Sequence, residues 1–247
     1  MIEGKTVVVT GGGKGIGRHA ALTFAKAKAK VAIVDVNEES LSKTSEELNR
    51  FSEVTSVNAD IRDEKAVHEM FSEVYQRFGQ IDVLVNNAAI VPHFAWGIPR
   101  WSLIRDMKKE FWDQVIDTNL GGTFLCTKCV LPYMEKQNSG HIINLYGGGG
   151  LKPGGSCAYV ATKDAIWTFT RYVSEEVRSS NICMVIFSPE VPIVTEGAPA
   201  DAFERLPTPE ILGEGFVLAA QLPLEETGKL FSYDNGKLVP GNDGRYS

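Results

Sequence analysis

Tyr159 and Lys163 are the residues whose types and spacing most directly suggest chemistry. They are four apart in YVATK (159–163), so a helix here would carry both side chains on one face. A free phenol has a pKa of about 10, and a neighbouring ammonium favours the phenolate. We therefore predict that Tyr159 exchanges a proton with a substrate and that Lys163 lowers the pKa of Tyr159. Taken alone, the spacing is equally compatible with an ordinary surface pair.

A glycine-rich segment near the N-terminus suggests a second kind of site. In TGGGKGIG (10–17), Gly11, Gly15 and Gly17 lie between an apolar run and a segment of helical period. Such a loop turns tightly and brings the N–H groups at a helix start close to a pyrophosphate. The segment is not a Walker loop, since Gly15 rather than Ser or Thr follows Lys14, and it is not a strict GxGxxG. It predicts a phosphate-binding loop.

Asp35 adds a nucleotide context to that loop. It ends the next apolar run, VAIVD (31–35), where a carboxylate accepts hydrogen bonds from both ribose hydroxyls of an adenosine. A 2′-phosphate would meet a like charge there, so the sequence favours NAD over NADP, although Lys14 could pair with such a phosphate. The alternative is a solvated carboxylate at a strand end.

The elements that must position these residues follow from the hydrophobic pattern. Segments of helical period, such as 38–50 and 63–78, separate short apolar runs, and strands that are apolar throughout are typical of a parallel sheet covered on both faces. We predict an α/β fold, a single domain over residues 1–247 with a doubly wound parallel sheet. The predicted strands are 6–10, 31–35, 54–58, 81–87, 141–146 and 182–187.

Composition excludes several classes of function. The net charge of −6 and a pI near 5.3 argue against nucleic-acid binding. No apolar run approaches the roughly 18 residues needed to span a bilayer, and the N-terminal run is too short and glycine-rich for a signal peptide. We expect a cytoplasmic protein that does not act on membranes.

Cys126 and Cys129 form a CxxC, but it lies in TFLCTKCVLPYM, which has the pattern of a helix. No second ligand pair stands at metal spacing, so we expect packing on a helix face and no metal site, with redox or metal use as the alternative.

Together these motifs resemble the short-chain dehydrogenase/reductase family, in its classical subfamily. The resemblance implies a Rossmann-type fold, an NAD(P)-dependent oxidoreductase acting on a small carbonyl or secondary alcohol, and a homotetramer. The matching segments are TGGGKGIG (10–17), NADIRD (58–63), NNAA (86–89), DTNLGGTF (117–124), YVATK (159–163) and the SPE to Thr segment (188–195).

The resemblance also assigns roles. Tyr159 would be the acid or base, Lys163 would also hold the nicotinamide ribose, and Asn119 would kink a helix and anchor a water that links the lysine to solvent. The implied cofactor contacts are Gly11, Gly15, Ile16 and Gly17 at the pyrophosphate, Asp35 at the adenosine ribose, Asp60 and Ile61 beside the adenine, Asn87 along the cofactor, and Thr195 at the carboxamide.

The sequence departs from the family where a serine is expected, about thirteen residues before the tyrosine. The ungapped match is Tyr146, and a one-residue gap gives Gly147. Tyr146 could present its own hydroxyl, Ser156 could substitute, Tyr159 could act alone, or turnover could be lost. Glu190 stands where the family has a glycine after Pro189.

Two segments, about 90–110 and 190–207, stand where substrate loops are expected. Phe94, Trp96 and Trp101 suggest an apolar wall or lid. The cations of the first segment either attract an anionic substrate or form a solvated face; they are His93, Arg100, Arg105, Lys108 and Lys109.

We therefore predict an oxidoreductase that moves a hydride between NAD(H) and a carbonyl or secondary alcohol. The rival is a catalytically silent protein of the same fold that still binds the nucleotide.

Overall fold

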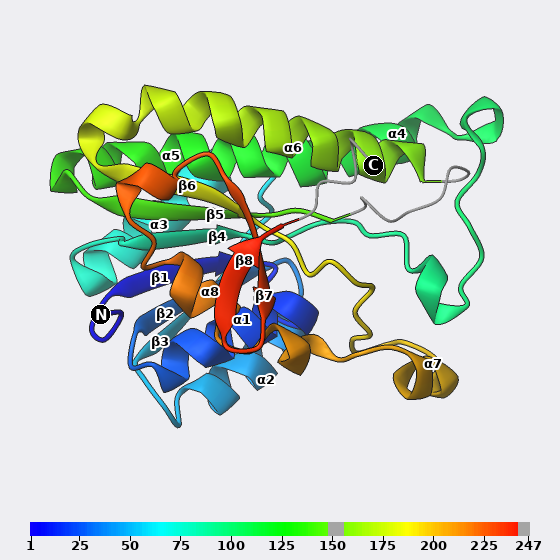
Figure 1. Cartoon of the computed structure of the whole chain (residues 1–247), viewed down its shortest axis with the longest axis horizontal. Coiled ribbons are helices and arrows are strands. Elements are labelled where there is room, and N and C mark those ends of the chain that lie inside the picture. The colour runs from blue at the N-terminus through cyan, green and yellow to red at the C-terminus, as the bar shows by residue number, and fades with distance from the viewer. Residues whose placement is uncertain (148–155, 242–247) are drawn as a thin grey trace.

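One sheet organises the chain in the computed structural model, which describes residues 1–147 and 156–241. Within these residues the strand order is β3-β2-β1-β4-β5-β6-β7-β8; all neighbours are parallel except β7 and β8 (Figure 1). The strands are β1 (Thr6–Thr10), β2 (Lys30–Asp35), β3 (Val54–Asn58), β4 (Val83–Asn86), β5 (Gly140–Leu145), β6 (Ile182–Phe187), β7 (Leu230–Asp234) and β8 (Lys237–Pro240).

Helices cover both faces of the sheet, which confirms the predicted doubly wound α/β fold. The α-helices are α1 (Gly15–Lys26), α2 (Glu38–Leu48), α3 (Glu64–Phe78), α4 (Lys109–Ile116), α5 (Gly122–Gln137), α6 (Cys157–Glu176), α7 (Ala200–Arg205) and α8 (Gly215–Ala219). Shorter helical turns are η1 (Phe94–Trp96), η2 (Ile104–Asp106), the π-helix η3 (Asp117–Gly121), η4 (Arg178–Ser180), η5 (Pro209–Leu212) and η6 (Leu224–Glu226).

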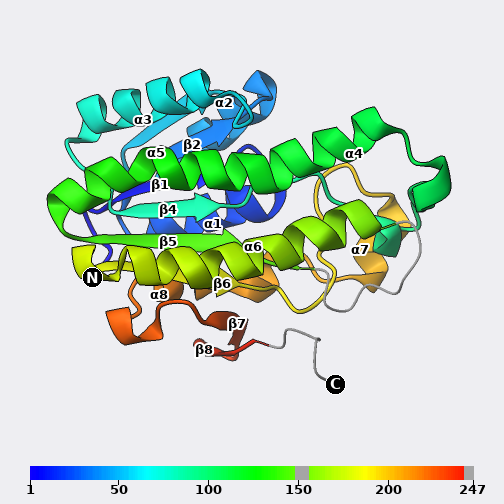
Figure 2. The same cartoon turned by 90° about the horizontal axis from the view of Figure 1, so that it is seen from above.

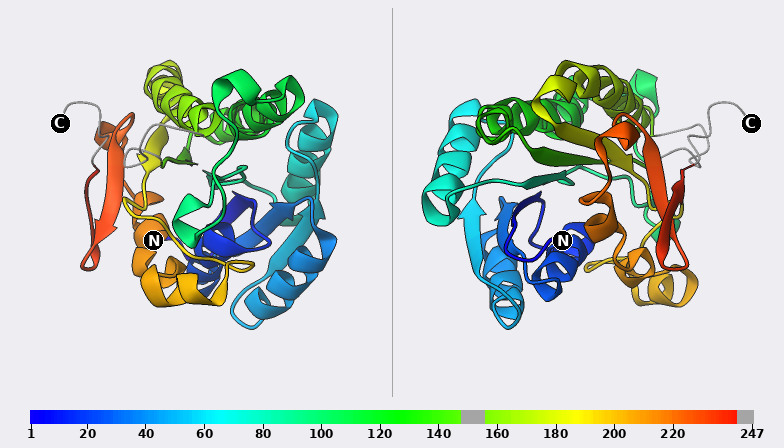
Figure 3. Two further views of the ribbon diagram at one scale, coloured as in Figure 1. Left: turned by 90° about the vertical axis from the view of Figure 1, so that its right-hand side faces the viewer. Right: turned by 60° about the vertical axis from the view of Figure 1, so that its left-hand side comes forward.

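Strand alternation explains the two layers. Val7 and Val9 of β1 pack with α1, α2 and α8, whereas Val8 between them packs with α3, α5 and α6. Successive side chains of a strand point to opposite faces, so a strand that is apolar throughout supplies both cores. Figures 2 and 3 show α5 and α6 side by side over one face.

The β7–β8 hairpin was not predicted from the sequence. It extends the sheet beyond β6, and its turn places Asn235 and Gly236 at φ 47° and 85°. Asn-Gly between two strands is a strong hairpin signal, because both residues tolerate positive φ. The signal is therefore present in the sequence.

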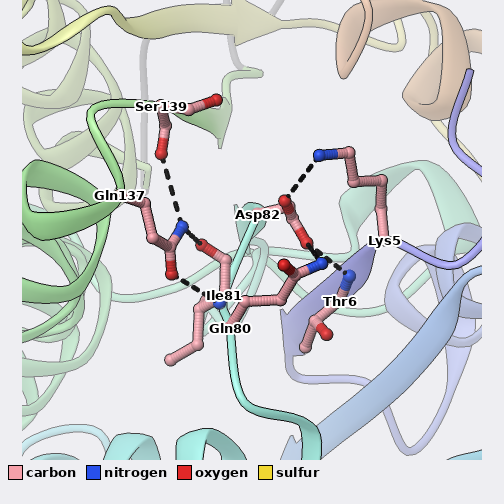
Figure 4. A network of polar contacts seen from close by, with 7 residues as sticks. All are labelled: Lys5, Thr6, Gln80, Ile81, Asp82, Gln137 and Ser139. Carbon is pink, nitrogen blue, oxygen red and sulfur yellow. Dashed lines mark hydrogen bonds and ion pairs between the residues drawn. The ribbon is translucent and has the colours of Figure 1, made fainter.

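A network of polar contacts joins the amino ends of the central strands (Figure 4). Asp82 accepts hydrogen bonds from the Thr6 N–H at 2.8 Å and from Lys5 Nζ at 2.9 Å. Gln137 of α5 bonds both backbone groups of Ile81, at 3.0 and 2.9 Å. This end of the sheet is occupied by structural contacts.

The CxxC lies on α5, and both of its thiols are buried. Burial raises the pKa of Cys126 and of Cys129, which keeps the thiols protonated. The predicted packing on a helix face is confirmed. Among the described residues there is no group of three His, Cys, Asp or Glu side chains suited to hold a metal ion, and no helix with the length and apolar character needed to cross a membrane.

Candidate active site

A cavity of about 770 Å³ lies at the carboxyl ends of the parallel strands, where open α/β sheets bind their ligands. It gathers sequence-predicted residues from both halves of the chain. Those that line it are Gly11, Lys14, Gly15, Ile16, Asp35, Asp60, Ile61, Asn87, Tyr146, Tyr159, Lys163 and Thr195. Gly17 and Asn119 are not among the lining residues. Gly17 packs against the Gly11 carbonyl, and Asn119 hydrogen-bonds to Ile90 and Thr162.

The glycine-rich loop is shaped by positions that other residues do not tolerate. Gly15 begins α1 at φ 60°, and a Cβ on Gly17 would overlap the carbonyl of Gly11. Asn87, from the end of β4, donates its Nδ2 to the carbonyls of Thr10 and Gly11 at 2.9 and 3.1 Å. The predicted cofactor residue Asn87 therefore also holds the loop in place.

Asp35 is fixed by two backbone donors. Its Oδ2 accepts from the Gly13 N–H and its Oδ1 from the Asn37 N–H, both at 3.1 Å. At the same edge, Asp60 pairs with Arg62, which the sequence reasoning missed; the shortest of their contacts is 2.6 Å. This pair lowers the pKa of Asp60.

Tyr159 and Lys163 occupy the first two turns of α6, both buried, with the lysine Nζ 5.6 Å from the tyrosine ring centre. Burial raises the pKa of Tyr159, and the nearby Tyr146 phenol adds to this effect. Burial also lowers the pKa of Lys163 to about 8, while its Nζ donates to the Leu145 carbonyl at 2.7 Å. The net shift of the Tyr159 pKa is therefore upward, opposite to the lowering expected from the Lys163 ammonium, because burial disfavours the charged phenolate.

Asn119 lies in the π-helix η3, between α4 and α5, so the predicted irregularity of the helix is present. Its Oδ1 accepts from the Ile90 N–H at 2.7 Å, and its Nδ2 donates to the Ile90 carbonyl and to Thr162 Oγ1 at 3.1 and 3.2 Å. Asn119 thus ties the loop after β4 to α6, one residue before Lys163. One-turn π-helices occur frequently at functional sites.

The family model described as short chain dehydrogenase matches residues 5–198. The chain belongs to the short-chain dehydrogenase family. A 3-oxoacyl-(acyl-carrier-protein) reductase of Thermotoga maritima is 32% identical over 252 residues, which cover 96% of this chain and 99% of that protein.

Solved structures of the short-chain dehydrogenase family agree in fold. A 3-ketoacyl-(acyl-carrier-protein) reductase from Brucella melitensis, complexed with NADH, has a TM-score of 0.80 at 26% identity and covers 94% of this chain and 97% of its own. An NAD⁺-bound xylitol dehydrogenase has a TM-score of 0.71 at 30% identity and covers 76% and 70%.

Tyr146 and Gly147 are the two residues at the position where the family resemblance led us to expect a serine. The Tyr146 hydroxyl donates to Asp164 Oδ1 at 3.2 Å, and the Tyr146 ring packs edge-on against Trp167. A Cβ added to Gly147 would lie 3.1 Å from the Tyr159 hydroxyl oxygen. Gly147 is therefore the residue whose missing side chain adjoins the Tyr159 hydroxyl. Ser156 is buried as the N-cap of α6, and residues 148–155 before it lie outside the described residues.

Glu190 adopts the backbone conformation that a glycine would favour. Its φ is 63°, and its N–H donates to Ser188 Oγ at 3.2 Å. The residue lines the cavity, while its Oε1 lies beside Gly241, past the end of β8. A left-handed conformation at a residue with a side chain is strained, and here it lies at the site.

The two predicted substrate loops pack on each other through Trp96. This side chain is buried, its Nε1 donates to the Ile193 carbonyl at 3.0 Å, and it packs with Val194 and Ala202. The His93 ring stacks on it with ring centres 3.7 Å apart. Of the three aromatic residues predicted to form an apolar wall, Trp96 lines the cavity, whereas Phe94 and Trp101 are not among its lining residues.

The cations of the first loop divide into two kinds. Burial lowers the pKa of His93, and the charge of Lys14 adds to this effect, so the ring that lines the cavity is neutral near pH 7. Arg105 pairs with Asp106 at 3.2 Å, and Lys109 pairs with Asp113. These exposed pairs favour the solvated face over an anion-attracting one.

Sequence reasoning missed Glu196, which directly follows Thr195. Its Oε2 accepts from the Gly15 N–H at 2.8 Å, and its Oε1 lies 3.3 Å from Arg18 Nη1. The partners are more than 170 positions away in the chain, and no local pattern reveals the contact.

Proposed function

We propose that the protein transfers a hydride between NAD(H) and a carbonyl or secondary alcohol, with Tyr159 as the acid or base. The observation that carries the proposal is a single cavity lined by Tyr159 and Lys163 at one end and by Gly11, Gly15 and Asp35 at the other. A proton-transfer group and a nucleotide-binding loop that share one cavity are suited to a nicotinamide reaction.

The residues present fit a dinucleotide. Gly11 and Gly15 would hold the pyrophosphate, Asp35 the adenosine ribose, and Lys163 the nicotinamide ribose. A side chain at Gly17 would fill the space on which the loop depends. When bound, the nicotinamide supplies the hydride for reduction or accepts it in oxidation.

Tyr159 would provide the proton. Its raised pKa keeps the phenol protonated at neutral pH, which suits it to donate to a carbonyl oxygen as that oxygen gains negative charge. The phenolate left behind would then be stabilised by Lys163 and protonated again from solvent. Alcohol oxidation needs the phenolate at the start and should therefore gain with rising pH.

NAD is the cofactor we favour, since the Asp35 carboxylate would repel a 2′-phosphate. Arg62 lines the same cavity but is paired with Asp60, and Lys14 is exposed. The relatives solved with NADH and with NAD⁺ support this choice.

The substrate class is drawn from the relatives' names. They include a 3-oxoacyl-(acyl-carrier-protein) reductase and a xylitol dehydrogenase, so 3-oxoacyl thioesters and polyols form the first panel, to which we add simple ketones and diketones as general carbonyl substrates. We also propose a homo-oligomer, as the family resemblance implies, because α5 and α6 expose Phe124 and Tyr172.

The test is a fluorescence titration with NADH and with NADPH, followed by turnover against that panel for the wild type and Tyr159→Phe. We expect tighter NADH binding, and a loss of turnover of roughly 10²- to 10⁴-fold in the variant with NADH affinity within about twofold. Unchanged turnover in Tyr159→Phe would remove this residue from the mechanism.

A catalytically silent nucleotide-binding protein is the second candidate. It is favoured by Gly147, which offers no side-chain donor beside the Tyr159 hydroxyl, and by the strained Glu190 at the cavity. Tight NADH binding with no turnover on the whole panel would support it.

A further inference from the structure

The amino end of α1 already carries an anion supplied by the chain itself. The Gly15 N–H, the first of this helix, donates to Glu196 Oε2 at 2.8 Å. Lys14, the N-cap residue, has an extended backbone and makes no side-chain capping bond. The orphan donor at the helix start is thus satisfied by a carboxylate from the segment 190–207 rather than by its own cap.

This donor is one that a dinucleotide would use. Gly15 belongs to the glycine-rich loop, and an unpaired N–H at a helix start, together with the helix dipole, is an anion site. A carboxylate and a pyrophosphate are both anions, and each would accept from the same N–H. They cannot occupy that donor together, and their like charges repel.

Arg18 offers the carboxylate a second position. Its Nη1 lies 3.3 Å from Glu196 Oε1, and its Nε and Nη2 are held by Glu47 of α2 at 2.8 and 2.9 Å. Glu196 is half exposed, so it has room to turn away from Gly15 while it stays close to Arg18.

The position of Glu196 links this exchange to the loop that covers the site. Thr195, beside it, lies against Gly15, where a Cβ would approach Thr195 Cγ2 to 3.2 Å. Three residues before Glu196, the Ile193 carbonyl accepts a hydrogen bond from Trp96 Nε1. A change at Glu196 therefore reaches both the phosphate loop and the substrate-side wall.

Resting on the proposed function, we infer that Glu196 is an internal competitor of the cofactor pyrophosphate. Without nucleotide it holds the segment 190–207 against the phosphate loop. When a pyrophosphate binds, the carboxylate leaves the Gly15 N–H for Arg18 and the segment is released. Nucleotide affinity and the position of the segment are then coupled reciprocally.

The test measures binding without turnover. ADP-ribose, which carries the pyrophosphate but no nicotinamide, is titrated calorimetrically into wild type, Glu196→Gln and Glu196→Ala, with adenosine as the phosphate-free ligand. Glu204→Gln is the matched control, because Glu204 is exposed on α7 in the same segment. We expect ADP-ribose to bind roughly 5- to 30-fold more tightly to both Glu196 variants. In the wild type the pyrophosphate must first displace the charged Glu196 carboxylate from the Gly15 N–H, and neither variant has this carboxylate. Adenosine affinity and Glu204→Gln should match the wild type.

Hydrogen exchange gives a second, independent readout. ADP-ribose should increase exchange at residues 194–198 of the wild type, adenosine should not, and Glu196→Ala should show the faster exchange before any ligand is added. ADP-ribose affinity that is unchanged or weaker in both variants would overturn the inference.

The outcomes separate this inference from the proposed function. If ADP-ribose binds more tightly to the Glu196 variants but no substrate is turned over, the catalytic proposal fails and the inference about Glu196 is supported. If neither the wild type nor the variants bind ADP-ribose, the phosphate loop is not a nucleotide site and both proposals fail.

Discussion

At the scale of single residues, burial acts on the two central side chains in opposite directions. It raises the pKa of Tyr159 and lowers that of Lys163 to about 8, in each case towards the neutral form. The cavity thus holds a protonated phenol beside a lysine whose pKa is about 8. Burying the Lys163 ammonium lowers the free energy of unfolding, so a group retained for function reduces stability.

Replacing Lys163 with methionine should stabilise the protein at neutral pH while it abolishes turnover. The folded-state pKa of about 8 lies below the ordinary 10.5, so the unfolded chain binds more protons between these values. The free energy of unfolding should therefore rise with pH across this window, and the full cost of the buried ammonium is present below it. We expect Lys163→Met to gain roughly 1–3 kcal/mol at about pH 7, with the lost bond to the Leu145 carbonyl as an opposing effect.

Urea unfolding of wild type and Lys163→Met at about pH 7 and about pH 9.5 measures this difference. The gain in unfolding free energy of Lys163→Met over the wild type should be smaller at the higher pH. If Lys163→Met is less stable than the wild type at neutral pH, the prediction is wrong.

Gly147 offers a position for adding a hydroxyl beside Tyr159. Because a Cβ there lies 3.1 Å from the Tyr159 oxygen, Gly147→Ser would bring a donor close to the place where, in the proposed reaction, the substrate oxygen gains charge. One such donor can be worth about 10²- to 10³-fold, and we expect turnover to rise at least roughly tenfold. Gly147→Ala is the control, with the same Cβ and no hydroxyl.

If Gly147→Ser turns over no faster than Gly147→Ala, the site does not lack a donor at this position. Tyr146→Phe then becomes the decisive variant, since it removes the hydroxyl that now bonds Asp164.

At the scale of elements, two contacts decide how the loops meet over the cavity. Asn119 in η3 joins the loop after β4 to α6, and Trp96 of η1 joins that loop to the segment after β6. The π-helix η3 carries the buried Asn119 side chain, and the Trp96 indole gives the segment after β6 its buried contact at Ile193.

Trp96→Ala should loosen the segment 190–207 more than it disturbs the sheet. The loss of a buried tryptophan costs roughly 3–5 kcal/mol, and we expect this cost to appear locally, as faster hydrogen exchange in that segment. The KM of the carbonyl substrate should rise more than the Kd of NADH.

Trp101→Ala serves as the comparison, because Trp101 packs on Phe111 of α4. Equal hydrogen-exchange rates of the segment 190–207 in Trp96→Ala and Trp101→Ala would show that Trp96 does not hold this segment.

At the scale of the whole molecule, the two ends of the sheet do different work. The amino ends carry a structural network around Asp82, whereas the carboxyl ends open on the cavity. Parallel strands with crossover helices place all their carboxyl ends at one edge, so residues far apart in the chain meet there.

The exposed side chains of α5 and α6 lead to a prediction about assembly. Phe124 and Tyr172 are 46% and 70% exposed, which is high for large apolar groups. If these helices form the subunit contact, charged residues at both positions should dissociate the oligomer, because two buried charges would face each other. Light scattering of Phe124→Lys with Tyr172→Lys measures the mass, and Phe203→Lys on α7 is the control. A wild type that is monomeric, or a double variant of unchanged mass, would contradict the assignment.

The sequence by itself determined the features that depend on local pattern. The apolar runs predict six of the strands, because a strand buried on both faces must be apolar throughout. Twelve of the predicted site residues line the cavity, since short motifs fix where a strand gives way to a loop or a helix. The β7–β8 hairpin was missed although its Asn-Gly turn is plain in the sequence.

Only the tertiary structure decided the contacts and charges that depend on distance in space. Glu196 reaches Gly15 across 181 positions, and Tyr146 turns its hydroxyl to Asp164 rather than showing it free to a substrate. The shift of the Tyr159 pKa also reverses the expectation from the pair alone, because burial is set by every element around the phenol. Spacing along the chain names the groups that can react, but the dielectric surroundings and packing that set their proton affinities exist only once the chain has folded.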